Sequence, residues 1–478
     1  MLLFLISCQT EPGNYSFSIG KNSPKNAEDS PFNERGIISA TWSETMLLTW
    51  DEGESNERIE LHYQQLDASG IPLSETKKNL DVDGTETDLT LEMDTEYEFW
   101  VTYHSDNTQE GDERKLKQWT GENRLIYRSE LALSKAMDLW GTTMRDREIV
   151  AIGGGTNPNT SALIVDTTDP YNLQTLYRFT DAGYGRDVKI FDNLLFIAVD
   201  PSADNCAQCD DIGVRIYDLS EPSDPILLST ISSPTSSVHN LTYHQGFLYL
   251  ASMTEQELVI YDLRDPTSPN RIADWQPNMV MPPMLLDVGV APHDMYAFKD
   301  KLYVAHGLGF SILDISNPYN PKDLYDHFIE WGTHNIWTDP TEQLLYTSRE
   351  IAGGPLQIWE LTETSEGYEA IELSSTATGD DRCIHNVHTK DQYIFGAWYV
   401  DGLLVFDGST PENPELVGWY DTFDGFYEVF ENEFNGELMP PIVGAWGVWP
   451  YGNHIAVSDT MRGLIIFDFY PHKVIWDE

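Results

Sequence analysis

Leu258–Pro266, with the sequence LVIYDLRDP, is the stretch that decides the fold. Its short apolar run ends at Asp262, and a polar turn then leads to the proline. A run of this length is typical of a strand buried on both faces. The aspartate can accept a hydrogen bond from the backbone of its own turn, and the proline cannot donate to a β-ladder. The segment therefore predicts a buried strand that stops at a tight turn.

This pattern recurs seven times, at intervals of 44 to 61 residues. The apolar runs are 162–166, 214–218, 258–262, 310–314, 356–360, 403–407 and 464–468. Each copy has a further strand before it, such as 247–250, and after it, such as 226–228. Four strands in roughly 50 residues form one blade of a β-propeller. We predict an all-β propeller over residues 124–478, with seven blades, or six if the first copy is not a full blade. Either 125–128 or 472–476 is expected to complete the last blade.

The repeated strands resemble LVIVD repeats, which are named for this kind of apolar run. Residues from about 137 to 470 are also similar to the choice-of-anchor B family of bacterial lipoproteins and secreted proteins. The motifs are HNVH at 385–388, WYVDGL at 398–403, GAWGVWP at 444–450, SD at 458–459 and GL at 463–464. The resemblance implies a propeller attached to the cell envelope by one of several anchors, and it supplies no catalytic residues.

The first eight residues, MLLFLISC, are predicted to be a lipoprotein signal peptide. Seven residues before Cys8 cannot span a bilayer, which needs about 20. Leu5 to Cys8 resembles the bacterial lipobox, so we expect Cys8 to be lipidated and to anchor the protein in the bacterial envelope, at the outer membrane. No lysine or arginine precedes the apolar run, and a start further upstream would supply one. Residues 9–36 are rich in Asn, Ser and Pro and are predicted to be a flexible tether.

A small β-sandwich is predicted over residues 37–106, where apolar and polar residues alternate in several short runs. It resembles a fibronectin type III domain. Trp50, Leu91 and Tyr97 carry the resemblance, which implies that the tyrosine hydroxyl bonds back to the backbone. Residues 107–123 are expected to be a linker. Such a module serves as a spacer or a binding platform.

The composition limits the partners. The net charge of −50 repels nucleic acid and anionic membrane surfaces, so no nucleic-acid partner is expected. A cationic partner or bound calcium ions are alternatives to simple solubility. Cys206 and Cys209 are predicted to form a loop disulfide outside the cytoplasm, because zinc would need a second ligand pair. Cys383 is predicted to be buried.

A polar pair opens the first strand of each predicted blade. The pairs are Met137-Asp138, Arg186-Asp187, His239-Asn240, His293-Asp294, His334-Asn335, His385-Asn386 and Trp446-Gly447. First strands surround a propeller's axis, so these side chains could converge at the channel mouth. The candidate ligand-binding residues are Arg186, His239, His293, His334, His385 and Trp446. The four histidines are candidate ligands for a transition metal, with Asn or Asp neighbours fixing the tautomer. Alternatively, each histidine bonds the next blade's backbone, or Arg186 marks an anion site.

Three functional hypotheses follow. The first is a non-enzymatic envelope protein whose propeller face binds a protein or a glycan. The second is a metal-dependent enzyme that uses the histidines at the channel mouth. The third is a polysaccharide-acting enzyme in which Arg186 and the histidines are acid–base groups and Trp398, Trp446 and Trp449 stack on sugars, unless those tryptophans pack in the core. The sequence assigns no catalytic residue and no cofactor, and fold alone does not choose among the hypotheses.

Overall fold

A computed structural model of the chain describes residues 17–19, 37–42, 45–51, 57–67, 70–82, 84–105, 108–111, 115–133, 135–154, 160–180, 184–200, 213–232, 238–252, 255–277, 291–329, 332–365, 367–423, 430–431, 438–439, 441–452, 454–471 and 473–476. The chain divides into two compact units, Asn123–Phe469 and Met1–Glu122 with Tyr470–Glu478. The regular structure of the described residues is β-strand, apart from one short 3-10 turn at Ser74–Thr76. This part of the chain contains no helix with the length and apolar character needed to cross a bilayer.

The larger unit contains, within its described residues, seven four-stranded antiparallel sheets. The first three are β11 (Ala136–Met144), β12 (Arg147–Gly154), β13 (Ala162–Asp166) and β14 (Gln174–Phe179); β15 (Tyr184–Phe191), β16 (Leu194–Asp200), β17 (Gly213–Asp218) and β18 (Ile226–Ser232); and β19 (Val238–His244), β20 (Phe247–Ser252), β21 (Glu257–Asp262) and β22 (Asn270–Trp275). The next three are β23 (Pro292–Phe298), β24 (Lys301–His306), β25 (Gly309–Asp314) and β26 (Lys322–Phe328); β27 (Asn335–Thr338), β28 (Leu344–Ser348), β29 (Leu356–Thr364) and β30 (Gly367–Thr376); and β31 (Asn386–Lys390), β32 (Tyr393–Ala397), β33 (Leu403–Asp407) and β34 (Glu415–Tyr420). The last is β37 (Ala445–Tyr451), β38 (His454–Asp459), β39 (Gly463–Phe469) and β10 (Leu125–Ala132). A separate pair, β35 (Phe430–Glu431) and β36 (Leu438–Met439), precedes β37.

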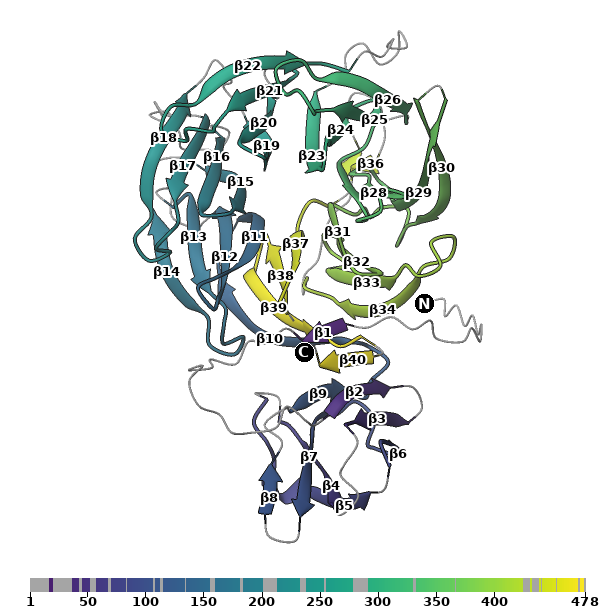
Figure 1. Cartoon of the computed structure of the whole chain (residues 1–478). Coiled ribbons are helices and arrows are strands. Elements are labelled where there is room, and N and C mark those ends of the chain that lie inside the picture. Colours follow the sequence, from purple (N-terminus) through teal and green to yellow (C-terminus); the bar gives the residue numbers. More distant parts are fainter. Residues whose placement is uncertain are drawn as a thin grey trace. The chain divides into compact units, whose positions relative to one another are not determined.

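The sheets surround a common axis (Figure 1). The first strand of each sheet contacts the first strand of the next, in the order β11, β15, β19, β23, β27, β31 and β37, and β37 contacts β11 again. This closed ring of inner strands makes the unit a β-propeller, as the repeats predict.

The repeated apolar strands are the third strands of their sheets, and they are buried as predicted. The aspartate that ends most of them also accepts a hydrogen bond from its own turn, two residues further on. The acceptors are Asp166, Asp218, Asp262, Asp314 and Asp407, with N–O distances of 2.8 to 3.1 Å. The repeat therefore encodes both the strand and its end.

The last sheet is completed by β10, which comes from the start of the unit. It pairs antiparallel with β39, with Leu125 opposite Phe469, and Arg128 Nε donates to Asp468 Oδ2 at 2.6 Å. The competing segment forms β40 (Lys473–Trp476), which pairs with β2 (Ile37–Trp42) of the smaller unit. The predicted propeller boundary at residue 478 is therefore wrong: the free edge of β39 is already occupied by β10, and the propeller ends at Phe469.

The smaller unit consists of two sheets. One has the order β1 (Phe17–Ile19), β40, β2 (Ile37–Trp42), β3 (Met46–Trp50) and β6 (Glu86–Leu89). The other has the order β5 (Lys78–Val82), β4 (Arg58–Gln65), β7 (Glu96–Ser105) and β8 (Thr108–Gly111), with β9 (Leu116–Trp119) also paired to β7. Trp50, Phe99 and other apolar residues form its core. The Tyr97 hydroxyl accepts a hydrogen bond from Glu92 N at 3.2 Å.

Two further predicted boundaries change in this unit. The segment expected to be a linker, 107–123, contains β8 and β9, and these residues form strands because both segments pair with β7. β1 lies in the segment expected to be a tether, 9–36, and pairs parallel with β40. Only β1 has a partner far away in the sequence, whereas β8 and β9 pair with the strand directly before them.

Candidate functional site

Several inner strands carry a β-bulge at the position of the predicted polar pairs, whereas β27 and β31 begin at Asn335 and Asn386 without a register shift in their described pairing. Arg186, His239, His293 and Trp446 are the extra residues at register shifts in β15, β19, β23 and β37. Neighbouring residues of a regular strand point to opposite faces, whereas a bulge turns one of them. Both members of a pair, such as His293 and Asp294, therefore line the same cavity at the channel end.

The histidines form a continuous arc, one from each of four successive sheets. The ring centroids of His239 and His293 are 4.1 Å apart, those of His293 and His334 are 4.1 Å apart, and those of His334 and His385 are 4.2 Å apart. Trp446 continues the arc, 4.1 Å from His385. We call these five residues the histidine arc. Arg186 lines the same cavity.

Backbone carbonyl groups fix the tautomers of two members of the histidine arc. His293 Nδ1 lies 3.1 Å from the carbonyl oxygen of His334, and His385 Nδ1 lies 2.7 Å from that of Trp446. A carbonyl only accepts, so Nδ1 carries the proton and Nε2 keeps a lone pair. These are the blade-to-blade contacts expected under the structural interpretation, and they leave Nε2 available to a ligand.

Burial keeps the imidazoles neutral. It lowers the pKa of His293 to about 3 and that of His334 to about 4. It also lowers the pKa of His239 and of His385 well below the ordinary value, and the neighbouring histidines act in the same direction. At neutral pH these side chains therefore offer lone pairs and carry no positive charge.

A polar ring lies next to the histidine arc. Its members are the second residues of the pairs: Asp138, Asp187, Asn240, Asp294, Asn335 and Asn386. Lys189 Nζ donates to Asp138 Oδ2 at 2.7 Å and to Asp187 Oδ1 at 2.6 Å. Asn335 Nδ2 donates to Asp294 Oδ2 at 2.7 Å. The expectation that Asn and Asp would fix the imidazole tautomers is wrong for His293 and His385, because backbone carbonyls do so.

The seventh pair has glycine in the polar ring because no side chain fits there. A Cβ atom on Gly447 would lie 2.6 Å from Asp138 Oδ1 and 2.9 Å from Ser458 Oγ. The adjacent carboxylate therefore occupies the space that a side chain would need.

Aromatic side chains fill the channel two residues further along the inner strands. Trp140 and Trp449 stack with their centroids 3.6 Å apart, and Tyr296 and Trp337 stack at the same distance. His388 lies 4.3 Å from Trp337 and 4.7 Å from Trp449. These five residues, the aromatic ring, pack across the channel. Sequence analysis predicted no role for Lys189 or for His388, although each stands two residues after a polar-ring member.

The cavity that remains between the histidine arc and the polar ring is small. Its volume is about 20 Å³. A single water needs at least roughly 10–15 Å³ of such space. The cavity suits an ion or a water molecule, and a sugar or a larger organic ligand does not fit.

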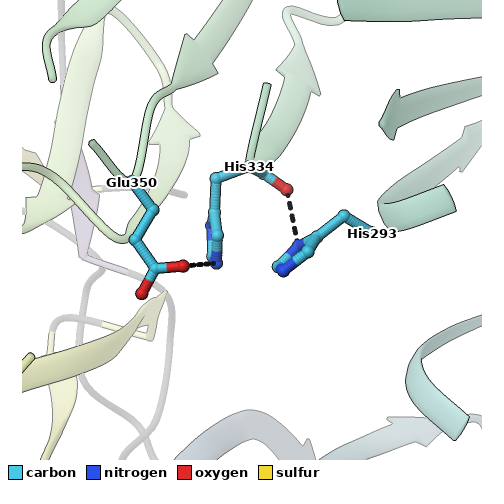
Figure 2. Close-up of side chains that lie close together, drawn as sticks. All are labelled: His293, His334 and Glu350. Carbon is cyan, nitrogen blue, oxygen red and sulfur yellow. Dashed lines mark hydrogen bonds and ion pairs between the residues drawn. The ribbon is translucent and has the colours of Figure 1, made fainter. Parts of the chain in front are cut away.

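One cluster at this end combines nitrogen and oxygen ligand atoms. One ring nitrogen each from His293 and His334 and one carboxylate oxygen of Glu350 all lie within 4.8 Å of one another (Figure 2). His334 Nε2 lies 3.5 Å from Glu350 Oε2, and the Tyr399 hydroxyl donates to Glu350 Oε1. Sequence analysis missed Glu350 and Tyr399, because neither belongs to the repeated pairs.

The other predicted site residues have different outcomes. Cys8, Cys206 and Cys209 lie outside the described residues. Cys383 is buried and unpaired, and burial together with the Glu350 and Asp401 carboxylates raises its thiol pKa. Trp398 is fully buried in a blade core, so it offers no surface for a sugar.

A buried His–Ser–Asp contact elsewhere in the propeller lacks the protonation needed for a nucleophile. His306 Nδ1 accepts a hydrogen bond from Leu308 N, so its Nε2 carries the proton beside Ser311 Oγ. Ser311 in turn donates to Asp326 Oδ1 at 2.5 Å. An imidazole that already carries its proton on Nε2 cannot take one from the serine.

Comparison with known proteins supports the fold. Residues 300–323 match the LVIVD repeat family. No curated protein matches the sequence. A Bacteroides fragilis protein provisionally assigned as a 6-phosphogluconolactonase has 12% identity and a TM-score of 0.51, with 70% of this chain and 97% of that chain covered.

Two other solved structures are similar. The β-propeller domain of Cps50 (Swd1) from Myceliophteria thermophila has 11% identity, a TM-score of 0.49, and 72% and 99% of the two chains covered. The periplasmic gluconolactonase PpgL of Pseudomonas aeruginosa has 10% identity, a TM-score of 0.48, and 71% and 98% covered. Fold and site together define a β-propeller protein with LVIVD-type repeats, whose channel is packed and whose histidine arc borders an ion-sized cavity.

Proposed function

We propose that this chain is a lipoprotein of the bacterial envelope whose β-propeller binds a protein or a glycan on one of its faces. The packing of the channel is the observation that supports binding of the partner on a face of the propeller. The stacked aromatic ring fills the channel, and the cavity beside the histidine arc measures only about 20 Å³. A partner larger than an ion must therefore bind outside the channel.

The charge of the chain favours a partner with a cationic surface. The net charge of −50 raises the association rate with a positively charged protein and opposes nucleic acid. A binding module of this kind needs no catalytic residue, which agrees with the absence of a competent nucleophile at Ser311. The lactonase names of the similar structures carry no weight here, since similarity at this level of identity concerns the fold alone.

The smaller unit supports a spacer role. We propose that it is a fibronectin type III-like module that holds the propeller away from a lipid anchor at Cys8. The bond from Glu92 N to the Tyr97 hydroxyl is the corner contact expected for this class. The terminal strands β1 and β40 are additions to that pattern.

The anchor is tested by expressing the full chain in a bacterium that processes lipoproteins. We expect the wild type to be recovered with membranes and to carry a lipid on Cys8, and the C8A variant to be released. A wild-type protein recovered without lipid in the released fraction would contradict the anchor.

The partner is tested with the unlipidated C8A chain on glycan arrays and on basic envelope proteins, at low and high salt. We expect saturable binding with hydrogen-exchange protection confined to one propeller face. Binding to a basic protein should weaken as salt rises. Protection of the channel strands alone, or no saturable binding to either class, would overturn the proposal.

A further inference from the structure

The cluster of His293, His334 and Glu350 has the composition of a metal site. Two imidazole nitrogens and one carboxylate oxygen lie within 4.8 Å of one another, and His334 Nε2 is 3.5 Å from Glu350 Oε2 (Figure 2). Nitrogen and carboxylate ligands bind transition metals at about 2.0–2.2 Å, which puts neighbouring ligands of a tetrahedral site about 3.3 Å apart. One pair already has this separation, and the third ligand needs a shift of about 1.5 Å at most.

The surrounding hydrogen bonds prepare these groups for a cation. The His334 carbonyl holds the proton of His293 on Nδ1, so Nε2 has its lone pair free. The Tyr399 hydroxyl donates to one oxygen of Glu350 and leaves the other facing His334. Metal-binding histidines commonly donate their second nitrogen to a carbonyl, and metal-binding carboxylates are commonly held by a donor in this way.

His334 provides a second, independent observation. This side chain is buried, and its backbone partner is His385 of the next sheet, although the contact at Nδ1 falls short of good hydrogen-bond geometry. A metal on Nε2 would place the proton on Nδ1, as in His293 and His385, whose Nδ1 atoms donate to the next sheet's backbone.

We propose that His293, His334 and Glu350 bind one divalent transition-metal ion at the end of the propeller channel, with Tyr399 as a positioning residue for Glu350. Two of these residues, His293 and His334, also line the ion-sized cavity. This inference is independent of the proposed binding of a protein or glycan. It concerns a metal site that the binding of such a partner does not require.

The groups around the site favour a cation over an anion. The lone pairs of His293 and His385 and the charge of Glu350 repel an anion, whereas Arg186 is the one positively charged side chain among the described residues that line the cavity. Imidazole ligands select Zn²⁺, Cu²⁺, Ni²⁺ or Co²⁺ over the calcium that the acidic composition suggested.

The test uses the full C8A chain, purified without a polyhistidine tag and stripped with a chelator. Co²⁺ is added while its visible absorption is recorded, and Zn²⁺ binding is measured by calorimetry and by competition with Co²⁺. The variants are H334Q, E350Q and Y399F, and H244Q is the matched control, because partly buried His244 lies at the other end of β19. Thermal unfolding reports whether each variant folds.

We expect one Co²⁺ per chain, with the absorption of a low-coordinate site that Zn²⁺ abolishes. H334Q and E350Q should lose this spectrum, Y399F should bind 10- to 100-fold more weakly, and H244Q should match the wild type. Metal should also raise the unfolding temperature of the wild type and leave that of E350Q unchanged. If H334Q does not fold, E350Q, which preserves shape, decides the question. No binding, equal binding by E350Q and wild type, or binding of phosphate in place of Co²⁺ would overturn the inference.

Discussion

The buried charge cluster in the channel predicts a large effect from one substitution, Lys189→Met. The ammonium group is bonded to Asp138 at 2.7 Å and to Asp187 at 2.6 Å, and the three side chains are at most 9% exposed. Methionine leaves two buried carboxylates without their cation. Removing one partner of a buried ion pair costs about 3–5 kcal/mol.

This magnitude can be measured by urea unfolding of the full chain. With an m value of about 3 kcal/mol/M, at the upper end for small proteins, the midpoint should fall by about 1 M or more. Trp140 is a local fluorescence probe, because Lys189 Nζ lies 5.2 Å from its ring centroid. Lys322→Met, at an exposed position of β26, should change the free energy of unfolding by less than about 0.5 kcal/mol.

The carboxylates allow a direct check of the reasoning. In the triple variant K189M/D138N/D187N, no charge of the cluster is left. Replacing a buried ion triad with uncharged residues often changes the free energy of unfolding very little. We expect it to recover most of the loss. K189M with wild-type stability, or a triple variant as unstable as K189M, would show that unpaired charge is not the cause.

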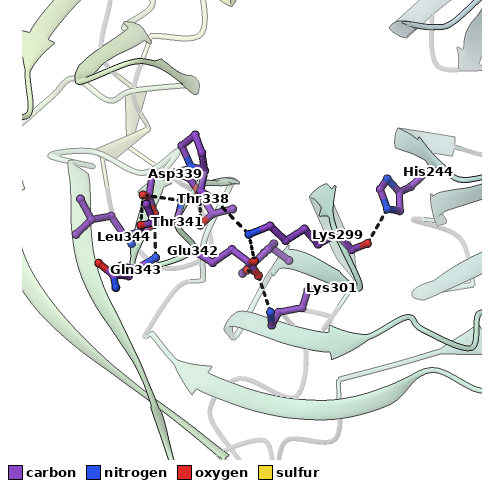
Figure 3. Close-up of polar contacts among 11 residues, drawn as sticks. His244, Lys299, Lys301, Thr338, Asp339, Thr341, Glu342, Gln343 and Leu344 are labelled. Atoms are coloured by element: carbon purple, nitrogen blue, oxygen red, sulfur yellow. Dashed lines mark hydrogen bonds and ion pairs between the residues drawn. The ribbon is translucent and has the colours of Figure 1, made fainter. Parts of the chain in front are cut away.

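Four further outcomes are expected. In E342Q, the loss of a carboxylate that binds Lys299 at 2.7 Å and Lys301 at 2.5 Å (Figure 3) should lower the unfolding free energy by about 1.5–3 kcal/mol, and an unchanged urea midpoint would contradict this. Burial opposes protonation of His454, but Asp468 and Glu148 hold its pKa above the ordinary value. The protonated side chain therefore contributes fully to the free energy of unfolding below about pH 6.5, and this contribution disappears as the pH rises above the pKa of His454 in the folded protein. The melting temperature should therefore fall between pH 6 and 8 more steeply in wild type than in H454Q, and parallel profiles would refute this. G309A should lower the melting temperature, because φ is 131° and its Cβ would lie 2.0 Å from the His327 carbonyl oxygen; an unchanged value would mean that the backbone relaxes. Because burial lowers the pKa of His293 to about 3 and that of His334 to about 4, Zn²⁺ affinity should be nearly constant from pH 7.5 to 5.5, whereas a fall near pH 6.5 would indicate exposed histidines.

Most of the propeller was predictable because its information is local and repeated. A run such as 258–262 specifies a buried strand, and Asp262 specifies its end by bonding its own turn. The partners of the terminal strands were not predictable, because they depend on which distant edge is free. Leu125–Ala132 and Lys473–Trp476 are both short β-type segments, and only the fold shows that β10 pairs with β39 and β40 with β2.

The site was predictable in part for the same reason. The position of the polar pairs in each copy placed Arg186 and the histidine arc near one another, and they line one cavity. The bulge that directs both members of a pair to the channel has no signature in the sequence. Glu350 and Tyr399 could not be found because neither belongs to a repeated pair, and the histidine tautomers depend on carbonyl groups contributed by the next sheet.

The charges around the channel give a reason for a cation at its end. The described carboxylates there are Asp138, Asp187, Asp294 and Glu350, whereas the cations are Lys189 and Arg186. Burial raises the pKa of Asp294 to about 6, which still leaves this side chain largely ionised at neutral pH. Glu350 faces the imidazole of His334, which burial keeps neutral. A divalent ion there would balance the two negative charges by which the four carboxylates exceed the two cations, so the excess of carboxylates favours a bound metal.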